Sequence, residues 1–175
     1  QKLWESVMGK LPNDLLTANY GIGDDYPVYY VNFSDICEYQ QFIHKLRLAT
    51  GKDYNLPSSE EWEYAARGGN KSKGYKYSGS DNIDEVAWYK ENSNEVLHPV
   101  GQKKANELGI YDMSGNVWEW TRFETTYLIK TPHMYEIRGG SWSGNEYVCK
   151  VNSYAIKEHL TSSPDVGFRL VIPAQ

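Results

Sequence analysis

A long stretch without hydrophobic periodicity, residues 68–110, limits the folds that this chain can adopt. The stretch is rich in Gly, Asn, Ser, Lys and Asp, and its apolar residues form only short islands such as residues 86–89. Long loops inside a compact domain are usually functional or metal-stabilised. We therefore expect a small set of regular elements with much irregular loop around it.

Regular elements are predicted on either side of this stretch. Ser34 is a good helix N-cap, apolar residues follow it on one helical stripe, and Gly51 ends that helix. A second helix begins after Ser58, which can form a capping box with Glu61, and stops at residues 68–69. Early helices and late strands favour an α+β fold. Extended or strand segments are predicted at residues 28–33, 111–122, 137–142 and 167–172.

The composition narrows the class of ligand. The chain has 18 basic and 23 acidic residues, whereas a nucleic-acid binder needs a clustered positive face. No stretch approaches the roughly 20 apolar residues of a membrane span. The 15 Tyr and 6 Trp residues suit half-buried surfaces and contact surfaces. Trp118, Trp120 and Trp142 are expected to lie in the core, the alternative being a platform on which sugars stack.

The start of the chain has a helical pattern over residues 3–8 that ends at Gly9, with no initiator Met and no signal peptide. We expect one domain over residues 1–175, truncated at its N-terminus, with any export signal upstream. The acidic, Tyr-rich and Lys-rich composition favours a bacterial or phage-borne protein of the cell surface or the extracellular space.

Four sequence blocks then occur in a fixed order. Residues 56–69 read LPSSEEWEYAARGG, 109–120 read GIYDMSGNVWEW, 138–142 read RGGSW, and 167–170 read GFRL. Together they closely resemble the formylglycine-generating enzyme, or sulfatase-modifying factor, domain family over essentially the whole chain. The resemblance implies a C-type-lectin-like fold: two helices around a small twisted antiparallel sheet, with extensive loops.

The resemblance implies three branches of function: copper-dependent formylglycine-forming oxidases, iron-dependent sulfoxide synthases, and non-catalytic binding proteins. The last include the variable proteins of diversity-generating retroelements. The oxidases hold copper(I), a soft metal that selects sulfur ligands, with two cysteines five residues apart. Here the first of these positions is Gly144 and the second is Cys149, and Cys37 is a poor replacement. We therefore expect no copper, assign no catalytic residue, and favour a protein that is not an enzyme.

Other chemistry has little support in the sequence. The iron-dependent branch needs clustered histidines, whereas His44, His98, His133 and His159 are far apart and in no spaced motif. There is no Ser/His/Asp set, no P-loop and no Gly-x-Gly-x-x-Gly motif. An oxidase with an altered metal site, an iron site supplied by an upstream domain, and a structural subunit of a surface assembly stay open as alternatives.

A calcium site is expected near the second block. A turn at residues 114–116 lets Asp112 and Glu119 approach each other, and converging carboxylates with turn carbonyls suit Ca²⁺. The resemblance implies that calcium is held by the side chains of Asp112 and Glu119 and the carbonyls of Gly115 and Val117, where it would pin a loop. The alternative is that Glu119 pairs with a nearby arginine and Asp112 caps the turn.

Segment 143–166 departs most from the family, yet the distance from Cys149 to Gly167 matches that of the variable proteins. Preserved length with divergent content is typical of a display surface, and Tyr with Asn and Ser is typical of adaptable paratopes. We expect a face that recognises a protein or other macromolecule, and the resemblance extends this expectation to diversification by a retroelement. The alternative is that these are ordinary strand and loop residues. Candidate contact residues are Asn145, Tyr147, Asn152, Tyr154, Ile156, His159 and Thr161.

Overall fold

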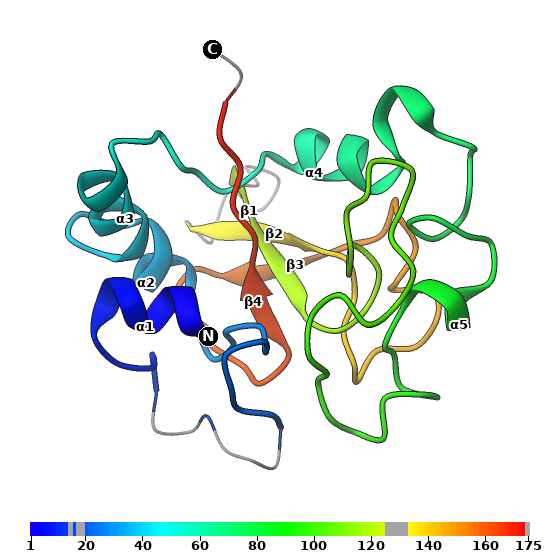
Figure 1. Ribbon diagram of the computed structural model, residues 1–175, viewed down its shortest axis with the longest axis horizontal. Helices are drawn as coiled ribbons and strands as arrows, with labels where there is room; N and C mark the ends of the chain where they lie inside the picture. Colours follow the sequence, from blue (N-terminus) through cyan, green and yellow to red (C-terminus); the bar gives the residue numbers. More distant parts are fainter. Residues whose placement is uncertain (14–15, 17–19, 125–132, 174–175) are drawn as a thin grey trace.

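The computed structural model describes residues 1–13, 16, 20–124 and 133–173 (Figure 1). Short helices precede the strands, as predicted for an α+β fold. In chain order the elements are α1 (Lys2–Met8), α2 (Phe33–Cys37), α3 (Phe42–Thr50), α4 (Ser59–Ala66), the 3₁₀ turn η1 (Gly69–Lys71), α5 (Ile83–Val86), β1 (Trp118–Glu124), β2 (Met134–Arg138), β3 (Tyr154–Glu158) and β4 (Val166–Phe168).

The four strands form one sheet in the order β3-β2-β1-β4. β1 and β3 run antiparallel to β2, as expected, but β4 runs parallel to β1. The β4 strand also packs closely on an earlier segment: a Cβ at Gly167 would lie 2.3 Å from the carbonyl oxygen of Val28. Glycine is therefore needed at this point of the sheet.

The helices are arranged around the sheet at two places. Figure 1 shows α1, α2 and α3 gathered at one end of the molecule and the irregular segments around α5 at the other, with α4 above the sheet. The largest core cluster joins α1–α3 to the sheet, and Trp120 on β1 is fully buried in it. None of the described helices has both the length and the apolar character needed to cross a bilayer.

The start of α4 confirms the predicted capping box. The amide of Glu61 donates to Oγ of Ser58 at 3.1 Å, and the amide of Ser58 donates to Glu61 Oε2 at 2.7 Å. Each group satisfies a backbone donor that the first helical turn leaves unpaired. The capping box therefore determines where α4, the helix that carries Trp62, begins.

The prediction of one helix from Ser34 to Gly51 is wrong at its start and in its continuity. The N-cap is Asn32, whose side chain accepts from the amide of Asp35 and whose amide donates to Asp35 Oδ2. The chain leaves the helix at Glu38 and resumes as α3 after Gln41. Gly51 ends α3 in the left-handed conformation, as predicted.

The three tryptophans lie in the core, as expected. Trp118, Trp120 and Trp142 are 8%, 0% and 9% exposed, so they form no open stacking platform. The extended segment predicted at residues 28–33 joins no strand of the described sheet, and its last residue begins α2. Its residues instead support β1, because the carbonyl of Val31 accepts a hydrogen bond from Trp120 Nε1 at 3.0 Å.

The long loop is held largely by its own polar contacts. The buried amide of Asn106 donates through Nδ2 to the carbonyl of Ala65 at 2.8 Å and to Oγ of Ser78 at 3.0 Å. Its oxygen accepts from the amides of Leu108 and Ile110 at 3.0 and 3.1 Å. One side chain thus connects α4 to two turns of the loop.

Candidate functional site

The two positions that correspond to the copper-binding cysteines of the oxidases contain one thiol, that of Cys149, and one glycine, Gly144. Cys149 is fully buried, and burial raises the pKa of its thiol to about 12. Gly144 lies in a turn, where a Cβ would come within 2.6 Å of Val148 Cγ2. Burial likewise raises the pKa of Cys37 to about 12. Burial therefore favours the neutral thiol at both cysteines.

The histidines contact aromatic rings, a backbone carbonyl or one another. His98 stacks on Trp88 with ring centroids 3.7 Å apart, and its Nε2 lies 2.8 Å from the carbonyl oxygen of Ser93. The structure brings His133 and His159 together, with ring centroids 4.7 Å apart. Within the described residues, no group of three or more His, Cys, Asp or Glu side chains is placed to hold a metal.

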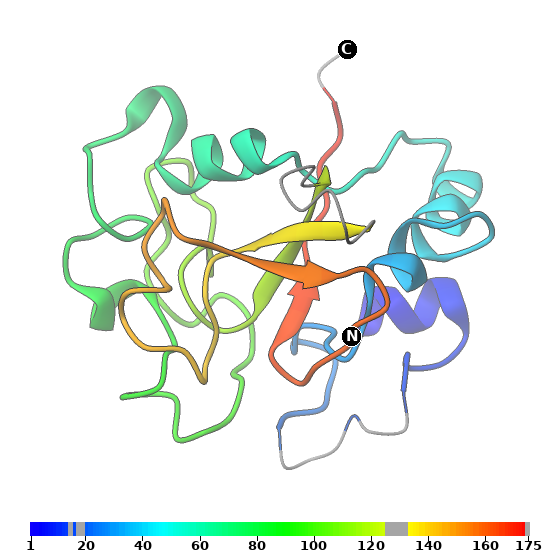
Figure 2. The ribbon, with the colours of Figure 1, turned by 180° about the vertical axis from the view of Figure 1, so that it is seen from behind.

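Most of the predicted contact residues are exposed. Asn145, Tyr147, Asn152, Tyr154 and Ile156 have exposed side chains, with Tyr147 and Tyr154 at 63% and 56%. Figure 2 shows the segment that carries them, the loop before β3 and β3 itself, on the near side of the molecule. We call these five residues the display surface.

Two predicted contact residues, His159 and Thr161, are half-buried and are therefore not counted in the display surface. Strand β3 alternates between exposed and half-buried residues, and Tyr154 and Ile156 occupy exposed positions. His159 is half-buried, and its carbonyl accepts from the amide of Phe33 at 2.9 Å. Thr161 is also half-buried, and its amide donates to the carbonyl of Glu158 at 2.9 Å. The backbone groups of both residues form hydrogen bonds in the turn after β3.

Side-chain hydrogen bonds hold the segment that carries the display surface. Oγ of Ser153 donates to the carbonyl of Tyr147 at 2.7 Å, which closes the loop before β3. After β3, Nζ of Lys157 donates to Oγ of Ser163 at 2.8 Å, and Ser163 donates to Asp165 Oδ1 at 2.7 Å. The side chains between the exposed positions therefore hold the segment in place.

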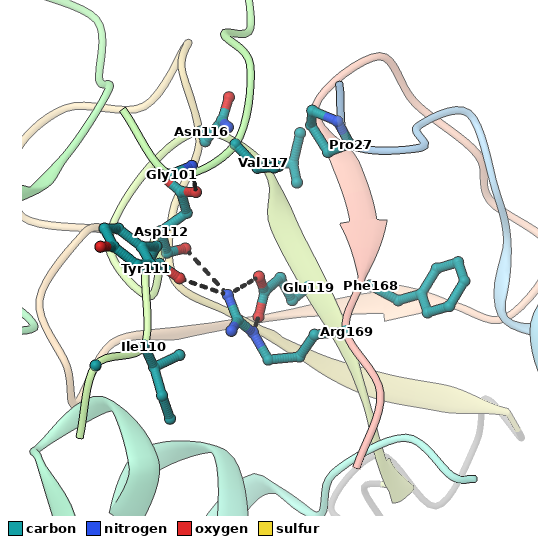
Figure 3. Close-up of a pocket in the computed structure, with 12 residues that line it drawn as sticks. Pro27, Gly101, Ile110, Tyr111, Asp112, Asn116, Val117, Glu119, Phe168 and Arg169 are labelled. Carbon is teal, nitrogen blue, oxygen red and sulfur yellow. Dashed lines mark hydrogen bonds and ion pairs between the residues drawn. The ribbon is translucent and has the colours of Figure 1, made fainter. Parts of the chain in front are cut away.

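The residues expected to bind calcium line a second feature, a hollow of about 500 Å³ beside β1 and β4 (Figure 3). Asp112, Val117 and Glu119 line it, and Gly115 lies in the adjoining turn. Burial raises the pKa of the Asp112 carboxyl, and Asp112 Oδ2 accepts from the amide of Gly101 at 2.7 Å.

Glu119 does not face open space in this hollow. Its Oε2 accepts from Arg169 Nε at 2.5 Å and from Trp62 Nε1 at 2.6 Å, and its Oε1 accepts from Arg169 Nη2 at 2.7 Å. Burial opposes the charge on Arg169, but Glu119 and then Asp112 more than offset it, so the pKa of the guanidinium is raised. The site is an ion pair inside a partly apolar hollow.

The sequence left open that Glu119 pairs with a nearby arginine, as the structure shows, but it identified neither Arg169 nor Trp62 as the partner. Both belong to quoted blocks, GFRL and EEWEY, but nothing in those patterns says which acidic residue they meet. Their contacts join α4, β1 and the residue after β4, which lie far apart in the chain. Only the fold reveals this pairing.

The four sequence blocks and the fold indicate the family to which the chain belongs. The chain belongs to the sulfatase-modifying factor enzyme 1-like domain family, whose model matches residues 4–174. The resemblance inferred from the four blocks is thereby confirmed.

The chain is similar to several known proteins. It is 41% identical over 143 residues to chaperone protein LppX of Paenibacillus barcinonensis, covering 67% of this chain and 49% of that protein. It is 30% identical over 160 residues to inactive C-alpha-formylglycine-generating enzyme 2 of Bos taurus, covering 83% and 50%. The chain thus spans about half the length of these relatives.

Among solved structures, Treponema denticola variable protein 1 superimposes with a TM-score of 0.80 and 26% sequence identity. The match covers 97% of this chain and 80% of that one. The predicted formylglycine-generating-enzyme-like fold is therefore confirmed.

Proposed function

We propose that this chain is a non-catalytic binding domain that recognises a protein through its display surface. The observation that carries the proposal is the exposure of Asn145, Tyr147, Asn152, Tyr154 and Ile156 on a segment whose intervening residues are anchored. Tyr supplies large, rigid contact area, and Asn supplies adaptable hydrogen bonds. A prearranged surface of this kind loses little conformational entropy when a partner binds.

The names of similar proteins support a binding role. One relative is called a chaperone protein, a second is called inactive, and the similar solved structure is called a variable protein. The family name also contains the word enzyme. The choice for this chain therefore depends on its own residues.

The chemistry of Gly144 and Cys149 argues against the oxidase alternative. Copper(I) chemistry of the kind implied by the resemblance needs two thiolates, whereas this segment has one buried thiol with a pKa of about 12. An oxidase would have to place its metal elsewhere. The binding role needs no such rearrangement.

Diversification by a retroelement is a finer part of the proposal. It rests on the mixed Tyr and Asn content of the display surface and on the likeness to a variable protein. Sequencing many independent copies of the gene tests it: substitutions clustered in codons 143–166 and confined to template adenines support it. An invariant segment overturns this part and leaves a dedicated binder or a structural subunit. A location at the cell surface or outside the cell suits either role.

The binding role is tested by capture with matched variants. The immobilised chain is exposed to surface proteins of the source organism, and retained proteins are identified by mass spectrometry. A partner is expected to be lost by the double variant Tyr154→Ser/Ile156→Ser. It should be retained by Tyr39→Ser/Leu48→Ser, which removes exposed apolar groups 76% and 75% accessible on the α2–α3 side.

Three results would count against the proposal. Equal retention by both double variants would show that the partner binds elsewhere. Stoichiometric copper binding with conversion of a cysteine-containing peptide would establish an oxidase. Retention of a polysaccharide or nucleic acid in place of a protein would overturn the stated class of ligand.

A further inference from the structure

The hollow beside β4 contains a positive charge supplied by the chain itself. Figure 3 shows the guanidinium of Arg169 between the turn that carries Asp112 and the side chain of Glu119. Nη2 of Arg169 donates to Glu119 Oε1 at 2.7 Å and to the carbonyl oxygens of Tyr111 and Asp112 at 3.2 and 3.4 Å. One cation therefore joins the irregular turn to the strand.

Glu119 already accepts three hydrogen bonds, out of the roughly four that a carboxylate can accept. Both of its oxygens accept from Arg169, and Oε2 also accepts from Trp62 Nε1. The Glu119 side chain is only 6% exposed. Calcium takes about six to eight oxygen ligands at roughly 2.3–2.6 Å, so at Glu119 it would have to displace the guanidinium or stand against it as a like charge.

The other implied side chain is engaged as well. Asp112 directs Oδ2 at the amide of Gly101, a contact that fastens the preceding loop to the turn. Its carbonyl oxygen faces Arg169 at 3.4 Å. Of the two side chains that the resemblance assigns to calcium, Glu119 is therefore paired with Arg169 and Asp112 is bonded to the loop, and this arrangement does not suit a calcium ion beside the guanidinium.

We infer that the Arg169 guanidinium takes the structural place of the divalent cation, so that this domain folds without calcium. The guanidinium joins the loop carbonyls to a strand carboxylate and balances the buried charge of Glu119. An arginine that contacts one carboxylate and two loop carbonyls joins the same parts of the chain that a calcium ion would join. Calcium bound at Asp112 and Glu119 is the rival prediction, and one experiment separates the two.

The experiment is a terbium and calcium titration of the whole chain. Tb³⁺ occupies calcium sites, and Trp62, which contacts Glu119 directly, would sensitise its luminescence. The wild type is expected to give no saturable terbium signal and the same melting temperature in calcium and in EDTA. A saturable signal that calcium displaces, with a calcium-dependent rise in melting temperature, overturns the inference.

The variant Arg169→Gln tests whether removing the guanidinium creates a calcium site. Without the guanidinium, the Glu119 carboxylate loses its cation and the carbonyls of Tyr111 and Asp112 lose a donor. The variant is expected to melt several degrees lower and to gain a terbium signal and a calcium-dependent stabilisation. Arg122→Gln, which removes an exposed arginine paired with Glu61, is the matched control and should gain neither. A folded Arg169→Gln variant that binds neither terbium nor calcium would contradict the inference that the guanidinium takes the place of the cation. If the variant does not fold, the titration of the wild type decides the question.

Discussion

The guanidinium carbon of Arg138 lies 5.4 Å from the centre of the Tyr154 ring, so the display surface rests directly on a cation of the sheet. Arg138 is itself fixed, because Nε and Nη2 donate to Oγ of Ser59 at 2.8 and 2.5 Å. Its guanidinium also pairs with Glu63 at 3.1 Å and with Glu136 at 3.3 Å. The first turn of α4 and strand β2 thereby set the position of Tyr154.

Replacing Arg138 by methionine is expected to destabilise the fold strongly. The Arg138 side chain is 9% exposed, and Arg138→Met removes the cation that pairs with Glu136 and one of the two cations that pair with Glu63, the other being Arg67. Removing one partner of a buried pair costs about 3–5 kcal/mol, and the partial exposure of Glu63 puts the expected loss near the lower value. Urea unfolding followed by circular dichroism measures it.

The matched control for this prediction is Arg122→Met. Arg122 and Glu61 form a pair whose side chains are 44% and 49% exposed, and such pairs contribute about 0–1 kcal/mol. Similar losses for the two variants would show that the Arg138 network does not hold α4 on the sheet.

The variant Tyr154→Ser is expected to weaken binding without unfolding the domain. Tyr154 is 56% exposed, so its removal should change the free energy of unfolding by about 1 kcal/mol or less, chiefly through the lost cation–π contact. Buried interface tyrosines often contribute about 2 kcal/mol, which corresponds to roughly thirtyfold in Kd. Surface plasmon resonance with the captured partner measures the change. Tyr39→Ser should leave Kd unaltered, and a loss for both variants would remove the special role of Tyr154.

Much of the fold could be predicted from local patterns. The capping box at Ser58 and Glu61 and the left-handed end at Gly51 are short-range signals that no tertiary contact overrides. The start of α2 was missed because Asn32 and Ser34 are both good helix N-caps. Asn32 is the N-cap in the structure because it forms two reciprocal hydrogen bonds with Asp35. Local sequence offers both choices, and only side-chain geometry separates them.

The sites were less predictable than the fold. Exposure of Tyr147 and Tyr154 follows from composition and strand alternation, so the sequence supported those candidates. The pairing of Glu119 with Arg169 depends on a parallel neighbour, because β4 lies beside β1 and brings Arg169 to Glu119. A strand order of this kind is a property of the whole chain, which residue spacing does not encode.

Asn106 is expected to be the most sensitive polar residue of the long loop. The variant Asn106→Ala removes four hydrogen bonds from a side chain that is 7% exposed. Buried groups left without partners cost about 1–3 kcal/mol each, so the expected loss is about 3 kcal/mol after partial relaxation. Urea unfolding measures the loss, and limited proteolysis should cut residues 68–110 sooner. Asn152→Ala, at an exposed position, should change stability by no more than about 0.5 kcal/mol.

Cys149 is expected to make the fold sensitive to alkali. Burial raises the pKa of its thiol from about 9 in the unfolded chain to about 12, so the folded state keeps the proton that the unfolded state loses. The stabilisation is complete below pH 9 and is lost as pH rises from 9 towards 12, by about 1.4 kcal/mol for each unit. Cys149→Ala removes this contribution, so the free-energy gap between wild type and variant should shrink by roughly 1 kcal/mol between pH 8 and pH 10. Denaturant unfolding at each pH measures the gap. Val148→Ala removes a neighbouring side chain that does not ionise, and its gap should stay constant. A constant gap for both variants would mean that Cys149 does not keep its proton in the folded chain.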